Sequence, residues 1–243
     1  MKLLIDADIL VYRCGFAAEN EKEFFARYNA RSQLYKMFDE TAVFDYQLFL
    51  TGKNNFREKE WSLVKYKGNR EKLRKPKHYD ALRKYLVDEW NALIIEGKEA
   101  DDALATAQVN DETIICSIDK DLDMVPGWHY NFVKKNKYYI TKLDGLINFY
   151  AQILSGDAVD NIPGLPGMGK IKAQKALKDL TTEEELQTKV RELYLSKAKE
   201  GKIALKSDVV IDITKLDDAL NEIGILLWMQ RHDQKEPKKF TTN

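Results

Sequence analysis

The chain lacks any long apolar run. Nothing in its 243 residues approaches about 18 consecutive apolar side chains, the length that suggests a membrane-spanning helix. The first residues also lack the apolar region of a secretory signal peptide, because the run that starts at Met1 meets an acid at Asp6. We therefore expect a cytoplasmic protein that does not associate with membranes.

The chain also has few cysteines and no excess of positive or negative charge. Cys14 and Cys116 lie far apart without metal-type spacing, which favours buried free thiols in a reducing compartment. The 39 basic and 39 acidic residues give no net charge. Residues 53–84, however, contain 12 Lys or Arg against 4 Asp or Glu, which gives this window +8 and leaves −8 elsewhere. This asymmetry favours an anion-binding segment and a separate acidic centre, although a solvated helix pair has the same composition.

Short apolar runs alternate with longer segments of helical periodicity. The predicted strands are Leu3–Ile5, Tyr46–Leu50, Ala92–Ile95 and Thr113–Ile118, with an edge strand at Tyr130–Val133. The predicted helices are Asn29–Phe38, Tyr79–Trp90, Ala100–Val109, Leu186–Lys199 and Leu216–Met229. Strands separated by helical stretches predict an α/β fold, with a mainly parallel central sheet flanked by helices. The chain after Tyr150 is expected to be mostly helical.

Acidic residues follow three of the predicted strands. They are Asp6 and Asp8, then Glu99, Asp101 and Asp102, then Asp119, Asp121 and Asp123. The carboxyl ends of parallel strands share one edge of a sheet, so these side chains are expected to gather there. A single acid at a strand end is more commonly a cap or turn residue, but so many carboxylates repel one another unless cations neutralise them. With no His or Cys among them, they favour two Mg²⁺ or Mn²⁺ ions, which promote phosphodiester hydrolysis.

A glycine- and proline-rich run lies between Gln152 and Lys170. Asp157 and Asp160, three residues apart in a predicted helical turn, can face one centre as ligands of a hard cation. Three glycines then mark a tight turn before the helix predicted over 170–180: Gly164, Gly167 and Gly169. Glycine lets backbone approach a partner closely, and a helix N-terminus offers N–H groups to an anion. The run therefore predicts a cation site beside a phosphate-binding turn.

Five separated blocks resemble, in order, the 5′ nuclease family of phage 5′→3′ exonucleases, flap endonucleases and the 5′-nuclease domains of bacterial DNA polymerases. The blocks are Leu4-Ile5-Asp6 with Tyr12-Arg13, Tyr66-Lys67-Gly68-Asn69-Arg70, Glu99-Ala100-Asp101-Asp102, Ser117-Ile118-Asp119-Lys120-Asp121, and Gly156-Asp157 through Gly169. They span roughly residues 1 to 180. The last block is the most specific, because it resembles the family's helix–three-turn–helix, which holds duplex DNA by its phosphates.

The resemblance implies a role for each matching residue. It implies that a first metal ion is bound by Asp6, Glu99, Asp101 and Asp102. Asp119 occupies the position of the family's bridging metal ligand. The second cluster of metal ligands is matched by Asp121, Asp157 and Asp160. It implies that Lys67 and Arg70 act in catalysis by contacting the scissile phosphate. The implied DNA contacts are Tyr66, Lys67, Arg70, Gly164, Gly167, Gly169 and Lys170. The implied cofactors are two Mg²⁺ (or Mn²⁺) ions, with K⁺ at the helix–three-turn–helix.

The resemblance also implies an architecture and partners. It implies a PIN-like 5′-nuclease fold in one domain, with a catalytic core at 1–150, a helical arch at about 54–90, the helix–three-turn–helix at 151–180 and C-terminal helices at 181–243. Single-stranded 5′ ends would pass beneath the arch, where Phe56, Trp61 and Tyr66 either stack on bases or, more commonly, are buried. The expected partners are DNA with 5′ ends, flaps or nicks and RNA–DNA primers, bound by a monomer in a bacterial or phage-infected cell.

One stretch departs from the family pattern. Members usually carry another metal-site aspartate at the end of the second strand, whereas Phe49-Leu50-Thr51-Gly52-Lys53 contains no acid. Asp8 is a candidate to compensate, although a hydrogen bond or cap is the commoner role. This departure leaves open a branched-DNA-binding protein that does not cleave. A haloacid-dehalogenase-like phosphatase, with Asp6 as nucleophile and Asp8 as general acid, is a second alternative, but it leaves the glycine-rich run unexplained.

Overall fold

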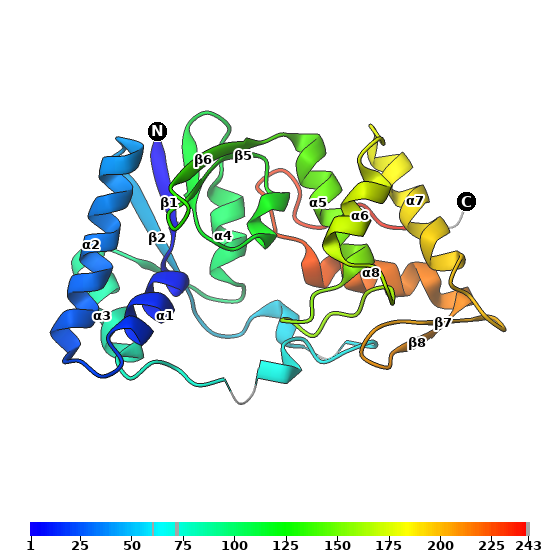
Figure 1. Cartoon of the computed structure of the whole chain (residues 1–243), viewed down its shortest axis with the longest axis horizontal. Helices are drawn as coiled ribbons and strands as arrows, with labels where there is room; N and C mark the ends of the chain where they lie inside the picture. Colours follow the sequence, from blue (N-terminus) through cyan, green and yellow to red (C-terminus); the bar gives the residue numbers. More distant parts are fainter. Residues whose placement is uncertain (60, 71–72, 242–243) are drawn as a thin grey trace. The chain divides into compact units, whose positions relative to one another are not determined.

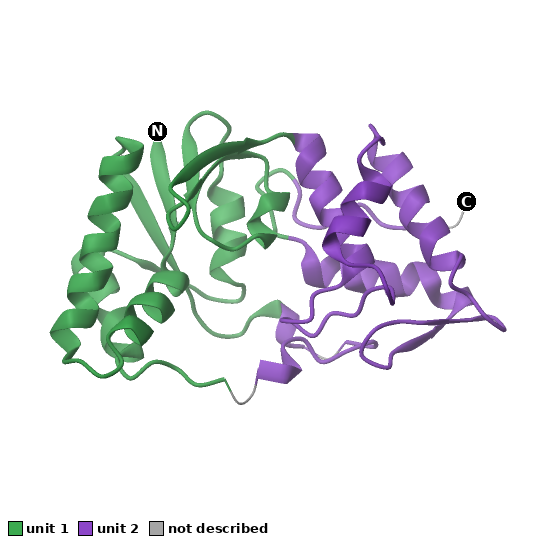
Figure 2. Cartoon of the chain, viewed as in Figure 1, with its two compact units in different colours: residues 1–56, 73–141, 229–233 green, residues 57–72, 142–228, 234–243 purple. Residues whose placement is uncertain are grey.

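The computed structural model describes residues 1–59, 61–70 and 73–241. They divide into two compact units (Figure 2). Unit 1 comprises residues 1–56, 73–141 and 229–233, and unit 2 comprises residues 57–72, 142–228 and 234–243. The single domain with subdivisions near residues 150 and 180 stays a prediction. Residues 57–72, part of the expected arch, belong to unit 2.

Unit 1 is built on a six-stranded sheet with the order β3-β2-β1-β4-β5-β6 (Figure 1). Its strands are β1 (Lys2–Asp6), β2 (Tyr46–Thr51), β3 (Leu93–Ile95), β4 (Thr113–Cys116), β5 (Gly127–Asn131) and β6 (Asn136–Ile140). Neighbouring strands are parallel except for the antiparallel pair β5–β6. The expected α/β fold with a mainly parallel sheet is confirmed. The strand expected at Tyr130–Val133 overlaps the end of β5, but its position at the edge is wrong. The Asn131 side chain accepts the N–H groups of Val133 and Lys134 and turns the chain into a hairpin, whose second strand β6 forms the edge.

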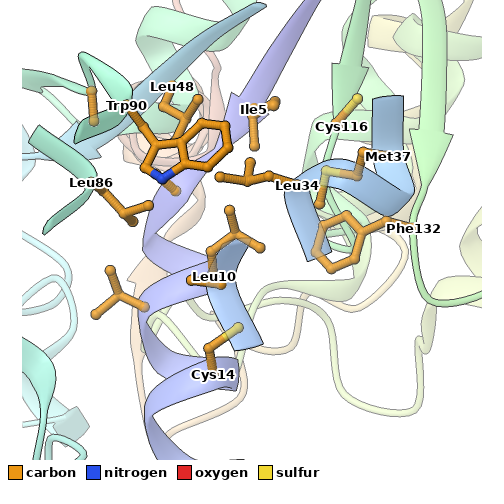
Figure 3. Close-up of a cluster of buried hydrophobic side chains, with 14 of the residues drawn as sticks. Ile5, Leu10, Cys14, Leu34, Met37, Leu48, Leu86, Trp90, Cys116 and Phe132 are labelled. Carbon is orange, nitrogen blue, oxygen red and sulfur yellow. The ribbon is translucent and has the colours of Figure 1, made fainter. Parts of the chain in front are cut away.

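The helices of unit 1 are α1 (Ala7–Ala17), α2 (Glu23–Thr41), α3 (Tyr79–Trp90) and α4 (Ala100–Ala107). One hydrophobic core joins α1, α2 and α3 to the sheet (Figure 3). It is formed by Ile5, Leu48 and Cys116 on strands and Leu10, Cys14, Leu34, Met37, Leu86 and Trp90 on helices. Both cysteines are free and buried, as expected. This core fixes α1 against the sheet, and thereby fixes the residues at the end of β1.

Unit 2 is mostly helical, as expected. Its helices are α5 (Lys142–Ser155), α6 (Lys170–Leu177), α7 (Glu183–Leu195) and α8 (Leu216–Leu227). Helix α5 contacts each of the other three, and Phe149 on α5 packs edge-on against Trp228 with ring centroids 4.8 Å apart. A short antiparallel ribbon, β7 (Lys202–Ala204) with β8 (Val210–Asp212), was not predicted. Each strand has one buried residue, which is too little for a periodicity signal.

The window expected to form an arch contains little helix before α3. Its described residues form two short 3₁₀ helices, Phe56–Glu58 and Gly68–Arg70, and then α3, which contacts α1 in unit 1. Residues 60, 71 and 72 of this window lie outside the described residues. The arch therefore stays a prediction. In the described part of the chain, no helix has the length and apolar character needed to cross a membrane.

Candidate active site

Asp6 ends β1 and caps α1. Its Oδ1 accepts the Ile9 backbone N–H at 3.2 Å, and its Oδ2 accepts the Ser117 hydroxyl at 2.8 Å. Ser117 directly follows β4, which pairs in parallel with β1, and its Oγ accepts the Asp119 N–H at 3.0 Å. Ser117 therefore fastens the ends of both strands together and brings Asp119 near Asp6. Sequence reasoning noted Ser117 only as part of a motif and missed this role.

The environment of Asp6 opposes its negative charge. Burial, followed by the nearby carboxylate of Asp8, raises the pKa of Asp6 to about 7, and Asp119 adds a smaller upward contribution. The hydrogen bonds from Ile9 and Ser117 only partly offset this. A buried carboxylate next to two others is an environment that a bound cation would stabilise.

Asp8 connects α1 to the end of β2. Its Oδ2 accepts the Thr51 N–H at 2.9 Å, and its Oδ1 accepts a hydrogen bond from Arg83 Nη1 at 3.0 Å. The second Arg83 nitrogen donates to the Thr51 carbonyl at 2.7 Å. Asp8 therefore forms the kind of structural hydrogen bonds that the sequence favoured. Both carboxylate oxygens of Asp8 are thus occupied by donors of the protein itself, which disfavours Asp8 as the general acid of the phosphatase alternative.

Glu99, Asp101 and Asp102 surround the start of α4. Glu99 is the N-cap, and Asp102 completes a capping box by accepting the Glu99 N–H at 3.2 Å. The other Asp102 oxygen accepts the Gln230 N–H at 3.0 Å, and Asp102 is fully buried. The negative charge of Glu99 contributes to a raised pKa at Asp8, where burial is the larger cause. Glu99 thus lies in the electrostatic environment of the Asp6–Asp8 pair, whereas both Asp102 oxygens are engaged by backbone.

Asp119, Asp121 and Asp123 follow β4. Asp119 is exposed, and its Oδ1 accepts the Asp121 N–H at 2.9 Å, which forms a turn before the 3₁₀ helix Asp121–Met124. Asp123 accepts the Tyr138 hydroxyl at 2.7 Å and so fastens the β5–β6 hairpin. Asp119 is therefore accessible beside Asp6, while Asp123 has a supporting contact.

The end of β2 has no room for the missing acid. A Cβ on Gly52 would come 2.6 Å from both Glu96 Oε1 and the Ile95 carbonyl oxygen. The Gly52 N–H donates to that carbonyl at 2.8 Å, and Glu96 Oε2 accepts the Lys53 N–H at 2.8 Å. A carboxylate from the end of β3 thus lies over the end of β2. Sequence reasoning missed Glu96, because only the β2–β3 register brings residue 96 next to residue 52.

In unit 2, Asp160 holds the two cations that were predicted to be catalytic. Arg70 Nη2 lies 2.5 Å and Lys67 Nζ 3.9 Å from its carboxylate oxygens, and the buried Tyr66 hydroxyl donates to it at 3.0 Å. The backbone is joined as well, because the Lys67 N–H donates to the Asp160 carbonyl at 2.9 Å and Arg70 Nε to the Val159 carbonyl at 3.0 Å. Residues 66–70 and 157–161 are therefore fastened into one local structure. Tyr66 is buried, which agrees with burial, the more common of the two roles expected for it, and not with stacking on bases.

The helical turn expected at Asp157–Asp160 is wrong. Asp157 Oδ1 accepts the N–H groups of Val159 at 2.7 Å and Asp160 at 3.3 Å, and the backbone of Asp157 pairs with Ile162. This Asx-type hydrogen bonding competes with helix formation. The two acids consequently do not share a helix face: Asp157 organises its own loop, and Asp160 holds cations from residues 66–70.

The glycines of the following turn differ in their surroundings. Gly164 is buried, and a Cβ there would lie 2.2 Å from the Gly156 nitrogen, so packing of two backbone segments requires it. Gly167 and Gly169 are exposed, and no atom of the described residues lies within 4 Å of a Cβ built at either position. Lys170 begins α6 directly afterwards. Close backbone approach is thus available at Gly167 and Gly169, while Gly164 has a packing role.

The predicted metal ligands divide between the two units. Asp6, Glu99, Asp101, Asp102, Asp119 and Asp121 belong to unit 1, and Asp157 and Asp160 to unit 2. Across the residues that the structure describes, no three Asp, Glu, His or Cys side chains form a preassembled metal site. The chemistry of the donors nevertheless fits a hard divalent cation, because Mg²⁺ takes one or two carboxylates and keeps several waters. Asp6 and Asp119 offer such a pair.

Comparison with known proteins identifies relatives in sequence. No family model matches the chain. It is 27% identical over 260 residues to DNA polymerase I of Bacillus subtilis (strain 168), which covers 92% of this chain and 28% of the polymerase. It is 28% identical over 231 residues to DNA polymerase I of Bacillus caldotenax, covering 82% of this chain and 25% of that protein. The chain therefore spans about a quarter of the length of these relatives.

Solved structures of bacteriophage T5 enzymes share the fold. The T5 5′-exonuclease with bound zinc superposes with a TM-score of 0.64 at 19% identity, covering 93% of this chain and 89% of that one. A complex of the T5 flap endonuclease with DNA and metal ions has a TM-score of 0.57 at 19% identity, covering 80% and 84%. The resemblance to 5′ nucleases predicted from the sequence motifs is confirmed, and the fold is that of the T5 5′-exonuclease.

Proposed function

We propose that this chain is a member of the 5′ nuclease family: a divalent-metal-dependent 5′→3′ exonuclease and flap endonuclease that hydrolyses DNA phosphodiesters during replication. One observation carries the proposal. The buried carboxylate of Asp6, whose pKa is raised, is held between the ends of β1 and β4 beside Asp8 and Asp119. The fold shared with the T5 enzymes, which are described with bound metal ions and DNA, supports it.

Two Mg²⁺ (or Mn²⁺) ions would be held at this edge of the sheet. The ligands would come from Asp6, Glu99, Asp101, Asp119 and Asp121, and the family resemblance implies Asp157 as a further ligand. Bound divalent cations would lower the pKa of the attacking water and neutralise charge on the phosphodiester. The protein's own groups prepare the site: Ser117 orients Asp6, and the capping role of Asp102 fixes the start of α4. Asp160 would act chiefly by placing the basic residues.

Lys67 and Arg70 would contact the scissile phosphate and stabilise the charge that develops on it. Asp160 and Tyr66 position both cations before substrate arrives. Lys67 also has a left-handed backbone with φ of 52°, a conformation that neighbouring contacts must maintain in a non-glycine residue. The Lys67 N–H bond to the Asp160 carbonyl is one such contact.

The substrate would be DNA with 5′ ends, flaps or nicks, and the enzyme would act as a monomer that also accepts RNA–DNA primers. Gly167, Gly169 and the start of α6 at Lys170 would hold duplex phosphates. Exposed glycines leave the backbone open, and the first N–H groups of a helix attract anions. The residues 54–90 would form the passage for a single-stranded 5′ end.

A timed digest of end-labelled 5′-flap, nicked and blunt DNA tests this function. We expect cleavage near 5′ ends and branch points with Mg²⁺ or Mn²⁺ and none with chelator. Binding of flap DNA without cleavage in either metal would instead support the branched-DNA-binding alternative. Steady release of phosphate from a nonspecific phosphatase substrate, with DNA left intact, would support the phosphatase.

A further inference from the structure

Lys206 lies between β7 and β8, and its ammonium group reaches the glycine-rich turn. Its Nζ donates to the Ser155 carbonyl at 2.7 Å and to the Met168 carbonyl at 2.8 Å. Its backbone N–H donates to the Gly164 carbonyl at 2.9 Å. One residue therefore joins the end of α5, the middle of the following loop and the turn before α6.

The two carbonyl oxygens that accept from Lys206 Nζ lie where a cationic donor is favourable. Ser155 ends α5, where the last carbonyls of a helix lack intrahelical partners and the helix dipole is negative. Met168 lies two residues before α6 in the turn itself. An ammonium group carries a full charge and three donors, which suits it to carbonyls that converge from separate segments. Lys206 is half-buried, so its position is defined by surrounding protein.

The loop that Lys206 joins to the end of α5 is tightly packed. Gly156 and Gly164 lie so close that a Cβ on Gly164 would be 2.2 Å from the Gly156 nitrogen. The loop that joins α5 to α6 is therefore folded tightly upon itself, with carbonyl oxygens brought near one another. A second lysine acts at the exposed side, where Lys172 Nζ donates to the Gly167 carbonyl at 3.2 Å. The turn is thus stabilised by ammonium groups on its carbonyls.

We propose that Lys206 is a tethered cation that holds the turn in its phosphate-binding conformation and replaces the K⁺ implied there by the family resemblance. K⁺ in proteins binds clusters of backbone carbonyls. The Ser155 and Met168 carbonyls are already bonded to Lys206 Nζ, so a K⁺ ion does not fit between them. Duplex binding at this turn then depends on total ionic strength and not on which monovalent cation is present. This inference rests on the proposed binding of duplex DNA.

The test compares Lys206→Met, which keeps an unbranched stem and removes the charge, with the wild-type chain. Affinity for a short duplex with a 5′ overhang is measured in potassium, sodium or choline chloride at one ionic strength. Wild-type affinity should be equal in all three salts. The variant should bind about tenfold more weakly in choline, the loss expected when a charged hydrogen-bond network worth ~1.4 kcal/mol is removed, and potassium should restore part of it.

Lys202→Met is the matched control, because it removes an exposed lysine from the neighbouring strand β7. It should weaken binding slightly and equally in the three salts. Wild-type affinity that rises in potassium, or a Lys206 variant that behaves like the control, would overturn the proposal.

Thermal unfolding without DNA separates this inference from the proposed function. Lys206→Met should lower the unfolding temperature in choline, and potassium should partly restore it, because the carbonyl cluster then accepts a free ion. A variant with wild-type unfolding in every salt means that Lys206 is no tethered cation. Wild-type protein that binds no duplex in any salt contradicts the proposed function, yet the unfolding measurement still reports on Lys206.

Discussion

Arg70 and Asp160 form a close ion pair, with 2.5 Å between Arg70 Nη2 and Asp160 Oδ1. Lys67 and the Tyr66 hydroxyl contact the same carboxylate. An acid that the motif implies as a metal ligand therefore holds the two cations that the motif implies for phosphate. Its negative charge fixes their positions, so Asp160 places the phosphate-binding residues of the proposed site.

Tyr66→Phe tests whether Asp160 acts through these cations. Removing the hydroxyl should loosen Asp160 and lower the single-turnover cleavage rate about tenfold to a hundredfold, because a hydrogen bond to a charged group contributes ~1.5–3 kcal/mol. The Mn²⁺ concentration for half-maximal rate should stay unchanged. Tyr139→Phe, on the exposed side of β6, serves as the control. A shifted Mn²⁺ requirement at unchanged maximal rate would show that Asp160 acts mainly as a metal ligand.

Asp119→Asn should abolish cleavage and leave DNA binding largely intact. Asp119 is exposed beside the buried Asp6, and the amide would keep its shape while removing the charge needed to bind a cation. Gel-based cleavage and anisotropy measure the two properties separately. Asp123→Asn is the control, because Asp123 contacts Tyr138 in the hairpin and should retain most activity. A near-normal rate in Asp119→Asn would refute its assigned role.

The raised pKa of Asp6 predicts how stability depends on pH. The pKa rises from 3.8 in its ordinary state to about 7 in the fold, so the folded protein binds this proton more tightly than the unfolded chain. The resulting stabilisation is present below the unfolded pKa and is lost as pH rises through about 7. Urea unfolding in chelator should therefore show Asp6→Asn to be more stable than wild type at pH 8.

Divalent metal should make the wild-type protein more stable than Asp6→Asn at pH 8, the reverse of the order in chelator. A bound cation stabilises the ionised carboxylate, so Mg²⁺ or Mn²⁺ should raise the wild-type unfolding temperature at pH 8 and affect Asp6→Asn much less. Asp102→Asn is a different case, because the amide can accept only one of the two backbone N–H groups that the Asp102 carboxylate accepts, which should destabilise the protein with or without metal. An Asp6→Asn protein less stable than wild type in chelator would contradict the pKa argument.

The sequence located the sheet because buried parallel strands are apolar on both faces, and β1, β2 and β4 are of this kind. The acids that follow β1 and β4 could be predicted as well, because parallel strands place their carboxyl ends at one edge of the sheet. Hydrogen bonds between side chains and the backbone could not be predicted from the sequence. The segment at Asp157 was therefore expected to be a helical turn, whereas its side chain forms an Asx-type loop. Glu96 and Lys206 were missed because strand register and contacts between distant segments decide their places.

Gly52→Ala should destabilise the protein by about 1–3 kcal/mol, the usual cost of forcing an extra methyl group into packed structure. The Ile95 carbonyl oxygen would lie 2.6 Å from the new Cβ, and backbone yields less readily than the Glu96 side chain. Gly52→Asp should suffer the same strain and gain no metal affinity. Urea unfolding and Mn²⁺ titration measure these effects. A stable Gly52→Asp protein that binds Mn²⁺ more tightly would mean that the end of β2 can accept an acid.

Gly169→Ala separates the phosphate-binding role of the turn from its folding. Gly169 is the N-cap of α6 with φ of −98°, which any residue adopts, and no described atom lies within 4 Å of a Cβ built there. The loss of stability should therefore be limited to about 1 kcal/mol, the cost of placing alanine instead of glycine at an N-cap. Gly167→Ala is a poorer test, since φ of 73° at that position would strain alanine.

Duplex affinity should nevertheless fall in Gly169→Ala, because a methyl group at the start of α6 keeps phosphate away from the helix N–H groups. The logarithm of affinity plotted against the logarithm of salt concentration should then have a shallower slope, since fewer phosphates are neutralised. Gly169→Val should enlarge both effects by adding bulk at the same position. Unchanged affinity and slope in both variants, with folding intact, would place the duplex on another surface of the chain.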